Sequence, residues 1–127
     1  MSVIVTDTGF GPDDWTLGFE GDGVLDLPSD TDPAALSAPE GTQMIRIDFP
    51  SFADGRGFTL ARLLRLRGYT GRLRAKGHVI SDQYAMARRS GFDEVEISDD
   101  LAARQPEADW QFRANWQQHD YQSRLRG

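Results

Sequence analysis

Three side chains that can act as acids or bases stand in two strand-like segments of the chain. Asp48 lies near the end of the first segment, and Lys76 and His78 lie in the second. A lysine set among arginines and acids is a candidate base, because neighbouring charges can alter the basicity of a lysine. If the protein is an enzyme, we expect Lys76 or His78 to act as the acid or base, with Asp48 and Glu96 as orienting carboxylates.

The stretch DFPSFADGRGF (48–58) is the second place where residue types suggest a function. Gly55 and Gly57 permit a close backbone approach and present Arg56 on a turn. A helix is expected to begin just after them, and its free N–H groups beside an arginine predict an oxyanion site. Asp54 supports the alternative interpretation, in which it pairs with Arg56 or accepts a backbone bond and the stretch is only a turn.

Further candidate binding residues follow the second strand-like segment. Asp82 and Gln83 come directly after HVIS, where a helix is expected to begin. Because the carboxyl ends of parallel strands meet at one rim, they are expected to lie on the same side as the DGRG stretch. The predicted anion- or ligand-binding set is Asp54, Gly55, Arg56, Gly57, Arg74, Lys76, Asp82 and Gln83.

The composition excludes several kinds of chemistry. The chain has 127 residues and no cysteine, which excludes disulfides, thiol nucleophiles and thiolate ligands to an iron–sulfur centre. Its two histidines, His78 and His119, are far apart in the sequence, so neither a metal site nor a cofactor is predicted. No apolar run approaches the roughly 20 residues of a membrane span, and no signal peptide is apparent, so we expect a cytoplasmic protein without a membrane partner.

The net charge of −6 conceals a division of the chain into three parts. Residues 1–52 carry ten acids and one arginine, residues 53–91 carry nine basic residues and two acids, and residues 92–127 carry eight acids and four arginines. A basic centre between acidic flanks suggests internal pairing or an anionic ligand. Nucleic acid is not expected, because the acidic flanks oppose phosphate.

The periodicity predicts a β-α-β-α-β-α order within a single α/β domain spanning residues 1–127. The expected strands are 44–49, 71–80 and 93–97, and the expected helices between them are 58–68 and 81–91. Helical crossovers imply a parallel sheet of three to four strands. We expect residues 1–40 to be irregular or hairpin-like, with a turn at residues 21–23, and we expect a helical tail over 99–124.

One face of the predicted sheet is apolar and the other is charged. Alternation places on the apolar face Ile45, Ile47, Phe49, Leu73, Ala75, Gly77, Val79, Val95 and Ile97. It places on the charged face Arg46, Asp48, Arg72, Arg74, Lys76, His78, Glu94 and Glu96. Both helices must cover the apolar face, so the charged face resembles the inside of a partial (β/α) barrel. That face is either solvated or covered by the N-terminal segment and laced with ion pairs, or it is a polar pocket for a small anion or carbonyl substrate.

The pattern closely resembles a bacterial family of unknown function, the DUF934 proteins. The resemblance rests on DFPSFADGRGFTLARLLR, GYTGRLRAKGHVISDQ and GFDEVEI, and it covers roughly residues 30–97. The family is often described as probably involved in sulfite reduction, and it has no established catalytic residues. Membership implies a place in assimilatory sulfur metabolism, with sulfite reductase or another enzyme of that metabolism as a partner. Without cysteine, the chain is not expected to be the catalytic reductase itself.

Three hypotheses on function remain open at this stage. The preferred one is an accessory protein of sulfite assimilation that binds a small oxyanion or a partner surface. The second is a small enzyme that uses the charged face for acid–base chemistry. The third is an interaction module without catalysis, which docks a partner or a second copy. An apolar edge or a self-complementary interface on the strand at 44–49 or at 93–97 would favour this hypothesis, because a partial barrel leaves strand edges that invite dimerisation.

Overall fold

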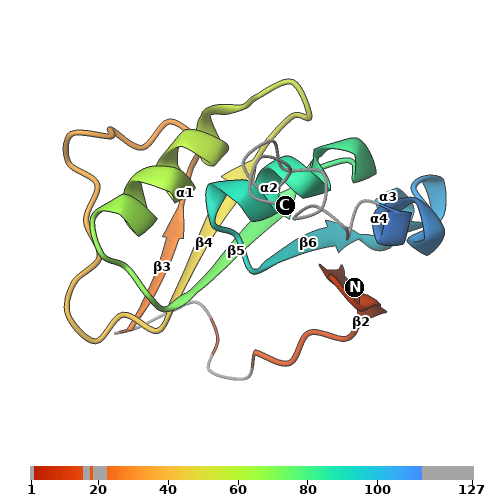
Figure 1. Cartoon of the computed structure of the whole chain (residues 1–127), viewed down its shortest axis with the longest axis horizontal. Helices are drawn as coiled ribbons and strands as arrows, with labels where there is room; N and C mark the ends of the chain where they lie inside the picture. The colour runs from red at the N-terminus through yellow and green to blue at the C-terminus, as the bar shows by residue number, and fades with distance from the viewer. Residues whose placement is uncertain (1, 16–17, 19–22, 113–127) are drawn as a thin grey trace, which may run out of the picture.

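The computed structural model describes residues 2–15, 18 and 23–112, which are built around one sheet of six strands (Figure 1). The strands are β1 (Ser2–Thr6), β2 (Gly9–Gly11), β3 (Val24–Leu27), β4 (Met44–Phe49), β5 (Arg72–Gly77) and β6 (Glu94–Ser98). The helices are α1 (Arg56–Leu66), the single 3₁₀ turn η1 (Ser81–Gln83), α2 (Tyr84–Ser90), α3 (Asp99–Arg104) and α4 (Glu107–Phe112). Across the sheet the strands follow the order β2-β1-β6-β5-β4-β3.

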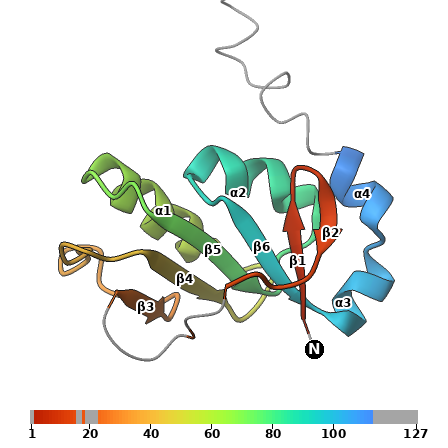
Figure 2. The same ribbon diagram turned by 90° about the horizontal axis from the view of Figure 1, so that it is seen from below.

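The predicted parallel core is confirmed. β3, β4, β5 and β6 are parallel neighbours, and Ile47 on β4, for example, lies opposite Ala75 on β5. The crossover helices α1 and α2 lie side by side on one face of the sheet (Figure 2). The described sheet is wider than predicted, because β1 pairs antiparallel with β6 and β2 pairs antiparallel with β1. The likeness to part of a barrel stays a prediction.

The N-terminal hairpin lies earlier in the chain than the sequence indicates. It consists of β1 and β2 with a turn at Asp7 and Thr8. Of the turn predicted at 21–23, residues 21 and 22 lie outside the described residues. The strand that follows, β3, pairs in parallel with β4, with Leu25 opposite Ile45. β3 is therefore the fourth parallel strand of the sheet, beside β4, β5 and β6.

The strands predicted at 44–49 and 93–97 do not lie at an edge of the described sheet. β4 lies between β3 and β5, and β6 lies between β5 and β1. At the β2 edge, the Glu107 carboxylate of α4 accepts a hydrogen bond from the Phe10 N–H at 2.7 Å. An edge covered in this way is a poor template for another strand. A homodimer stays a prediction, but it is not favoured by these strands.

Glycines end both crossover helices where the sequence predicted them to end. After α1, the N–H of Gly68 bonds to Arg65 and the N–H of Tyr69 bonds to Leu64, and Gly68 has φ +99°. The same pair of bonds follows α2 around Gly91, which has φ +116°. This left-handed conformation is accessible to glycine at little cost, and it satisfies the last carbonyls of each helix. The predicted start of the first helix was less accurate: α1 begins at Arg56, two residues before the start of the helix predicted over 58–68.

The apolar face of the sheet forms the core with α1 and α2, as predicted. The core strand side chains are Ile45, Ile47, Phe49, Leu73, Ala75, Val95 and Ile97, each at most 1% exposed. Three aromatic rings bridge the sheet and the helix layer: the centroid of Phe49 lies 4.9 Å from that of Phe58 and 5.8 Å from that of Phe92. Such tilted and edge-on pairs add to the stabilisation from burial.

The charged face is covered by the N-terminal strap, as we name residues 12–15, and is laced with ion pairs. Asp13 and Asp14 of the strap bond to Arg74 and Arg72 of β5. The ring of Trp15 lies 5.9 Å from the guanidinium carbon of Arg72, within range of a cation–π contact. Of the two interpretations of this face, the structure therefore supports the covered, ion-paired surface along most of its length.

The predicted C-terminal helix is divided into α3 and α4, which are separated at Gln105 and Pro106. Residues 113–124 of the prediction lie outside the described residues. The Trp110 side chain of α4 is 1% exposed and lies edge-on to Tyr84 of α2, with ring centroids 6.1 Å apart. In the described ranges, no helix combines the length and apolar character needed to span a membrane.

Candidate functional site

The carboxyl ends of β3, β4, β5 and β6 meet along one edge of the sheet, which we call the carboxyl rim. Ligand sites of open α/β sheets lie outside this edge. The segments that follow the four strands bring several of the predicted site residues to it, namely Asp54, Gly55, Arg56, Gly57, His78, Asp82 and Gln83. Asp48 and Lys76 lie one residue before the ends of β4 and β5.

Arg56 forms an ion pair with Asp54. The Nε and Nη2 atoms of Arg56 lie 2.9 and 2.7 Å from the two carboxylate oxygens, and Nη2 also lies 3.2 Å from the Ser29 hydroxyl. Hydrogen bonds from the Arg56 side chain hold the pKa of Asp54 well below its usual range. The Arg56 side chain is 60% exposed, so the pair adds little to stability. This geometry is the one that the turn interpretation predicted, and it leaves only Nη1 of the guanidinium without a described partner.

Gln83 ties two rim segments together. Its Nε2 donates to the Phe52 carbonyl at 2.7 Å, and its Oε1 accepts from the Ile80 N–H at 3.1 Å. Asp82 beside it is exposed. The glycines of the DGRG stretch lie at the start of α1, where Gly57 is buried against the Phe49 ring and Gly55 is the residue before the helix. The structure thus gives Gln83 and Gly57 clear roles in holding the rim.

Arg74 lies in the centre of the charged face and does not reach the solvent. Its side chain is 0% exposed, and it donates to Glu94 at 2.6 Å, to Glu96 at 2.8 Å and to Asp13 at 2.9 Å. Arg46 adds a further bond to Glu96 at 3.2 Å. Because its hydrogen bonds are made within the fold, Arg74 is not included in the ligand site described below.

The contact between the strap and Arg74 predicts a pH-dependent contribution to stability. The hydrogen bond from Arg74 lowers the pKa of Asp13. A carboxyl whose pKa is lowered in the folded state stabilises the fold above its unfolded pKa, and this contribution disappears as the pH falls below about 4. We expect Asp13→Asn to cost about 1 kcal/mol at pH 7. In urea unfolding, the difference in unfolding free energy between Asp13→Asn and the parent should become smaller below pH 4. A difference that does not change with pH would contradict the prediction. Asp100→Asn is the control, because it removes one negative charge elsewhere in the chain.

A cavity of about 250 Å³ opens at the carboxyl rim between β5, β6 and α3, and we call it the rim cavity. Its lining residues are Ser2, Lys76, Gly77, His78, Glu96, Ile97, Ser98, Leu101 and Arg104. Lys76 and His78 are the acid–base residues predicted from the sequence, and α3 adds a wall to the cavity beside them. The cavity is therefore the place where the predicted acid–base residues meet an accessible space.

Of the charged side chains that line the rim cavity, the acidic one has ion-pair partners and the two basic ones have none among the described residues. Glu96 accepts hydrogen bonds from Arg46 and Arg74, so its carboxylate is already hydrogen-bonded within the charged face. Lys76 and Arg104 form neither an ion pair nor a side-chain hydrogen bond with any residue that the structure describes. The cavity therefore presents two cationic groups without a described ion-pair partner, which favours the binding of an anion.

His78 and Asp48 flank Lys76. The Nδ1 atom of His78 lies 3.3 Å from the Phe49 carbonyl oxygen, and in the tautomer that donates this bond Nε2 is left as an acceptor. Asp48 lies directly opposite Lys76 in the strand register, and no ion pair joins them within the described residues. Three groups able to exchange protons thus lie together at the strand ends. Among the described residues, no three His, Asp or Glu side chains form a group that could hold a metal ion.

Four residues that line the rim cavity were not predicted as site residues from the sequence, namely Ser2, Ser98, Leu101 and Arg104. The helix predicted to begin at residue 99 does begin there as α3, and the Ser98 hydroxyl caps it by accepting from the Leu101 N–H at 3.1 Å, but its place beside a cavity was not predicted. The position of Arg104 at the cavity, at the end of α3, has no signature in the local sequence. Ser2 lines the cavity because β1 pairs with β6, which places Ser2 opposite Ser98.

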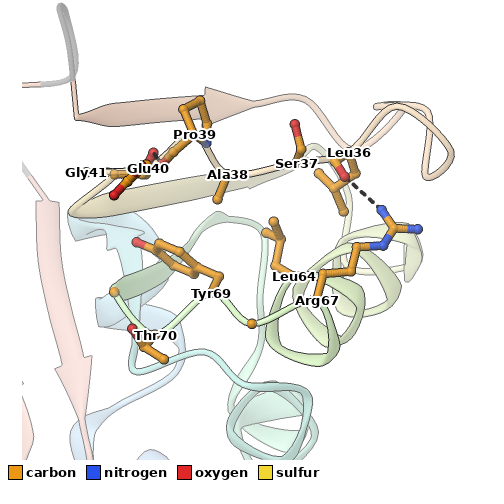
Figure 3. A pocket seen from close by; sticks show the side chains of 13 residues that line it. Leu36, Ser37, Ala38, Pro39, Glu40, Gly41, Leu64, Arg67, Tyr69 and Thr70 are labelled. Carbon is orange, nitrogen blue, oxygen red and sulfur yellow. Dashed lines mark hydrogen bonds between the residues drawn. The ribbon is translucent and has the colours of Figure 1, made fainter.

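A second cavity, of about 410 Å³, lies at the opposite end of the sheet (Figure 3). Residues 36–42 and the turn at 67–71 form its walls, with Ala38 and Pro39 across from Leu64 and Tyr69. Arg67 donates from Nη1 to the Leu36 carbonyl at 2.8 Å, as Figure 3 shows, and also to the carbonyl of Pro33. None of the predicted site residues lines this cavity.

The fold and the rim cavity define the class of the protein: an open α/β protein with a cationic pocket at the carboxyl ends of its parallel strands. The chain belongs to the family described as bacterial protein of unknown function, DUF934, which it matches over residues 24–126. The match includes β3 to α4, so the parallel core and most of the rim cavity lie within it. No curated protein and no solved structure matches the chain.

Proposed function

We propose that the protein is an accessory protein of assimilatory sulfite reduction that binds a small oxyanion in the rim cavity. The metabolic context comes from the family resemblance, and the binding chemistry comes from the cavity. Sulfite reductase or another enzyme of sulfur assimilation is the proposed partner, since a binding protein of this kind acts with an enzyme that produces or consumes the anion.

The observation that carries this proposal is the state of Lys76. It is the single lysine of the chain, which otherwise uses arginine for every basic side chain. Arginine forms planar paired hydrogen bonds with carboxylates, as Arg46, Arg72 and Arg74 do here, whereas lysine is a compact point charge. At the rim cavity this charge has no described ion-pair partner, so it is free for an anion.

The test is binding of sulfite, sulfate, phosphate and chloride at matched ionic strength, measured by calorimetry and thermal unfolding. A ligand that binds only the folded state raises its stability by mass action. We expect one oxyanion to bind selectively and Lys76→Met to weaken it by about tenfold or more, since a charge-assisted bond is worth roughly 1.5–3 kcal/mol. Arg62→Met is the matched control, because it removes an exposed cationic side chain from α1.

Two results would contradict the proposal. Equal stabilisation by all four salts would indicate general screening. An equal loss of binding in Lys76→Met and Arg62→Met would indicate an effect of net charge only. Arg56→Ala adds a third arm: if it abolishes binding while Lys76→Met does not, the site is the DGRG loop and not the rim cavity.

A small enzyme is the second candidate function. The observation that favours it is the position of Asp48 opposite Lys76 without an ion pair between them among the described residues, with His78 at the same strand ends. In this alternative, a bound anion would be consumed. Nuclear magnetic resonance spectra of a binding anion incubated with the parent and with Lys76→Met would separate the two functions, because only turnover produces new signals that the variant lacks.

A further inference from the structure

The rim cavity is larger than an inorganic oxyanion requires. Its volume of about 250 Å³ equals that of about eight water molecules at the roughly 30 Å³ each occupies in the liquid. Sulfite has four heavy atoms, so it would fill only part of this space. A ligand that fills the cavity must carry additional atoms beside its charged group.

The chemical character of the lining differs between its walls. Lys76 and Arg104 supply positive charge without described partners, whereas Leu101 and Ile97 supply apolar atoms. Leu101 is half-buried and packs against the hydrophobic core, so it presents a fixed apolar surface. The aliphatic stems of Lys76 and Arg104 extend that surface toward their charged ends.

The hydroxyl of Ser98 adds a hydrogen-bond donor. Its oxygen accepts from the Leu101 N–H, and its own hydrogen has no described acceptor. A serine hydroxyl can donate one bond while accepting another. An anionic head group placed between the two cations can therefore also accept a hydrogen bond from Ser98.

We propose that the rim cavity binds a small organic anion, whose sulfonate or carboxylate head lies at Lys76 and Arg104 and whose short apolar body lies against Leu101. This inference rests on the proposed function and specifies its ligand class. It differs from that function in a measurable way, because an apolar body contributes to affinity only if the cavity surrounds it.

The experiment compares sulfite with methane-, ethane- and propanesulfonate, and with butanoate as the carboxylate arm, by calorimetry on the full chain. We expect affinity to rise about fourfold for each added methylene, the factor that corresponds to about 0.8 kcal/mol of burial. Leu101→Ala should remove most of this increment, and Leu101→Met should retain it. Leu66→Ala, at a leucine that is 74% exposed on α1, is the matched control.

A second readout does not depend on the stability of the variants. Because Lys76 is the single lysine, its acetylation by an amine-reactive reagent can be followed by mass spectrometry in the folded protein. Ligands that bind in the rim cavity should slow this reaction in the same order as their affinities. Organic anions that bind without protecting Lys76 would overturn the proposal.

The outcomes separate the inference from the proposed function. If sulfite binds and the organic anions bind equally or more weakly, the inference is wrong and the proposed function stands. If no anion of either kind binds, both are wrong. A sulfonate series that gains affinity while butanoate does not bind specifies a sulfur oxyanion head, and equal binding of propanesulfonate and butanoate specifies a general anionic head.

Discussion

Replacing Arg74 by alanine lowers the free energy of unfolding by about 3–5 kcal/mol, because it breaks a buried ion pair from one side. Glu94 and Glu96 are 4% and 7% exposed, and in the parent both accept hydrogen bonds from the Arg74 guanidinium. Without it, Arg72 is the remaining ion-pair partner of Glu94 and Arg46 that of Glu96 among the residues that the structure describes. Urea unfolding followed by circular dichroism measures the loss.

The matched control for this prediction is Arg62→Ala, which removes the same kind of side chain from an exposed position on α1. It should change stability by no more than about 0.5 kcal/mol. Arg72→Ala is expected to fall between the two, since the Arg72 side chain is 27% exposed. A loss of less than 1 kcal/mol for Arg74→Ala would show that water replaces the guanidinium, and the account of the charged face would then be wrong.

Replacing Gly57 by alanine destabilises the protein by about 1–3 kcal/mol through overpacking. This reverses the usual order, since alanine in a helix interior is favoured over glycine by about 1 kcal/mol. The reason is the Phe49 ring, whose Cζ would lie 2.4 Å from the new Cβ, with two more ring atoms within 2.9 Å. The ring cannot move freely, because Phe49 is 1% exposed and packs against Phe58 and Phe92.

A double-mutant cycle tests the cause. In a Phe49→Leu background, which is itself less stable than the parent, Gly57→Ala should cost less than it does alone, because the smaller side chain leaves room for the added methyl group. Gly11→Ala is the control, since no atom lies within 4 Å of its Cβ position. Additive effects in the cycle would mean that Gly57 is required for a reason other than the Phe49 ring.

Local periodicity predicted the parallel core because each of its features depends on nearby residues. The alternation of RLRAKG fixed which side of β5 is charged, and the glycines at 68 and 91 marked both helix ends. The predictions failed where distant segments meet. Nothing local to the first residues shows that Val5 would pair with Val95, or that Asp13 would bond to Arg74.

The candidate site was predictable to the same extent. The rule that sites follow the carboxyl ends of parallel strands, together with alternation, identified Lys76 and His78. This rule could not show that the Arg56 guanidinium is paired with Asp54. The sequence DGRG is compatible both with an arginine that is free to bind a ligand and with one that is paired to the neighbouring aspartate. Arg104 was not predictable, because its place beside the cavity depends on how α3 leaves the sheet.

The position of β1 between β6 and β2 also has a consequence for synthesis on the ribosome. Residues 2–6 pair with residues 94–98, so the first strand has only the three-residue β2 as a partner until the last described strand has been made. At roughly 5–20 residues per second, the intervening stretch of about 90 residues takes about 5–20 s to translate. During that time the parallel strands can begin to assemble, while Ile4 and Val5 remain exposed to other nascent chains and to chaperones. The sheet is thus completed in a different order from that in which its strands emerge.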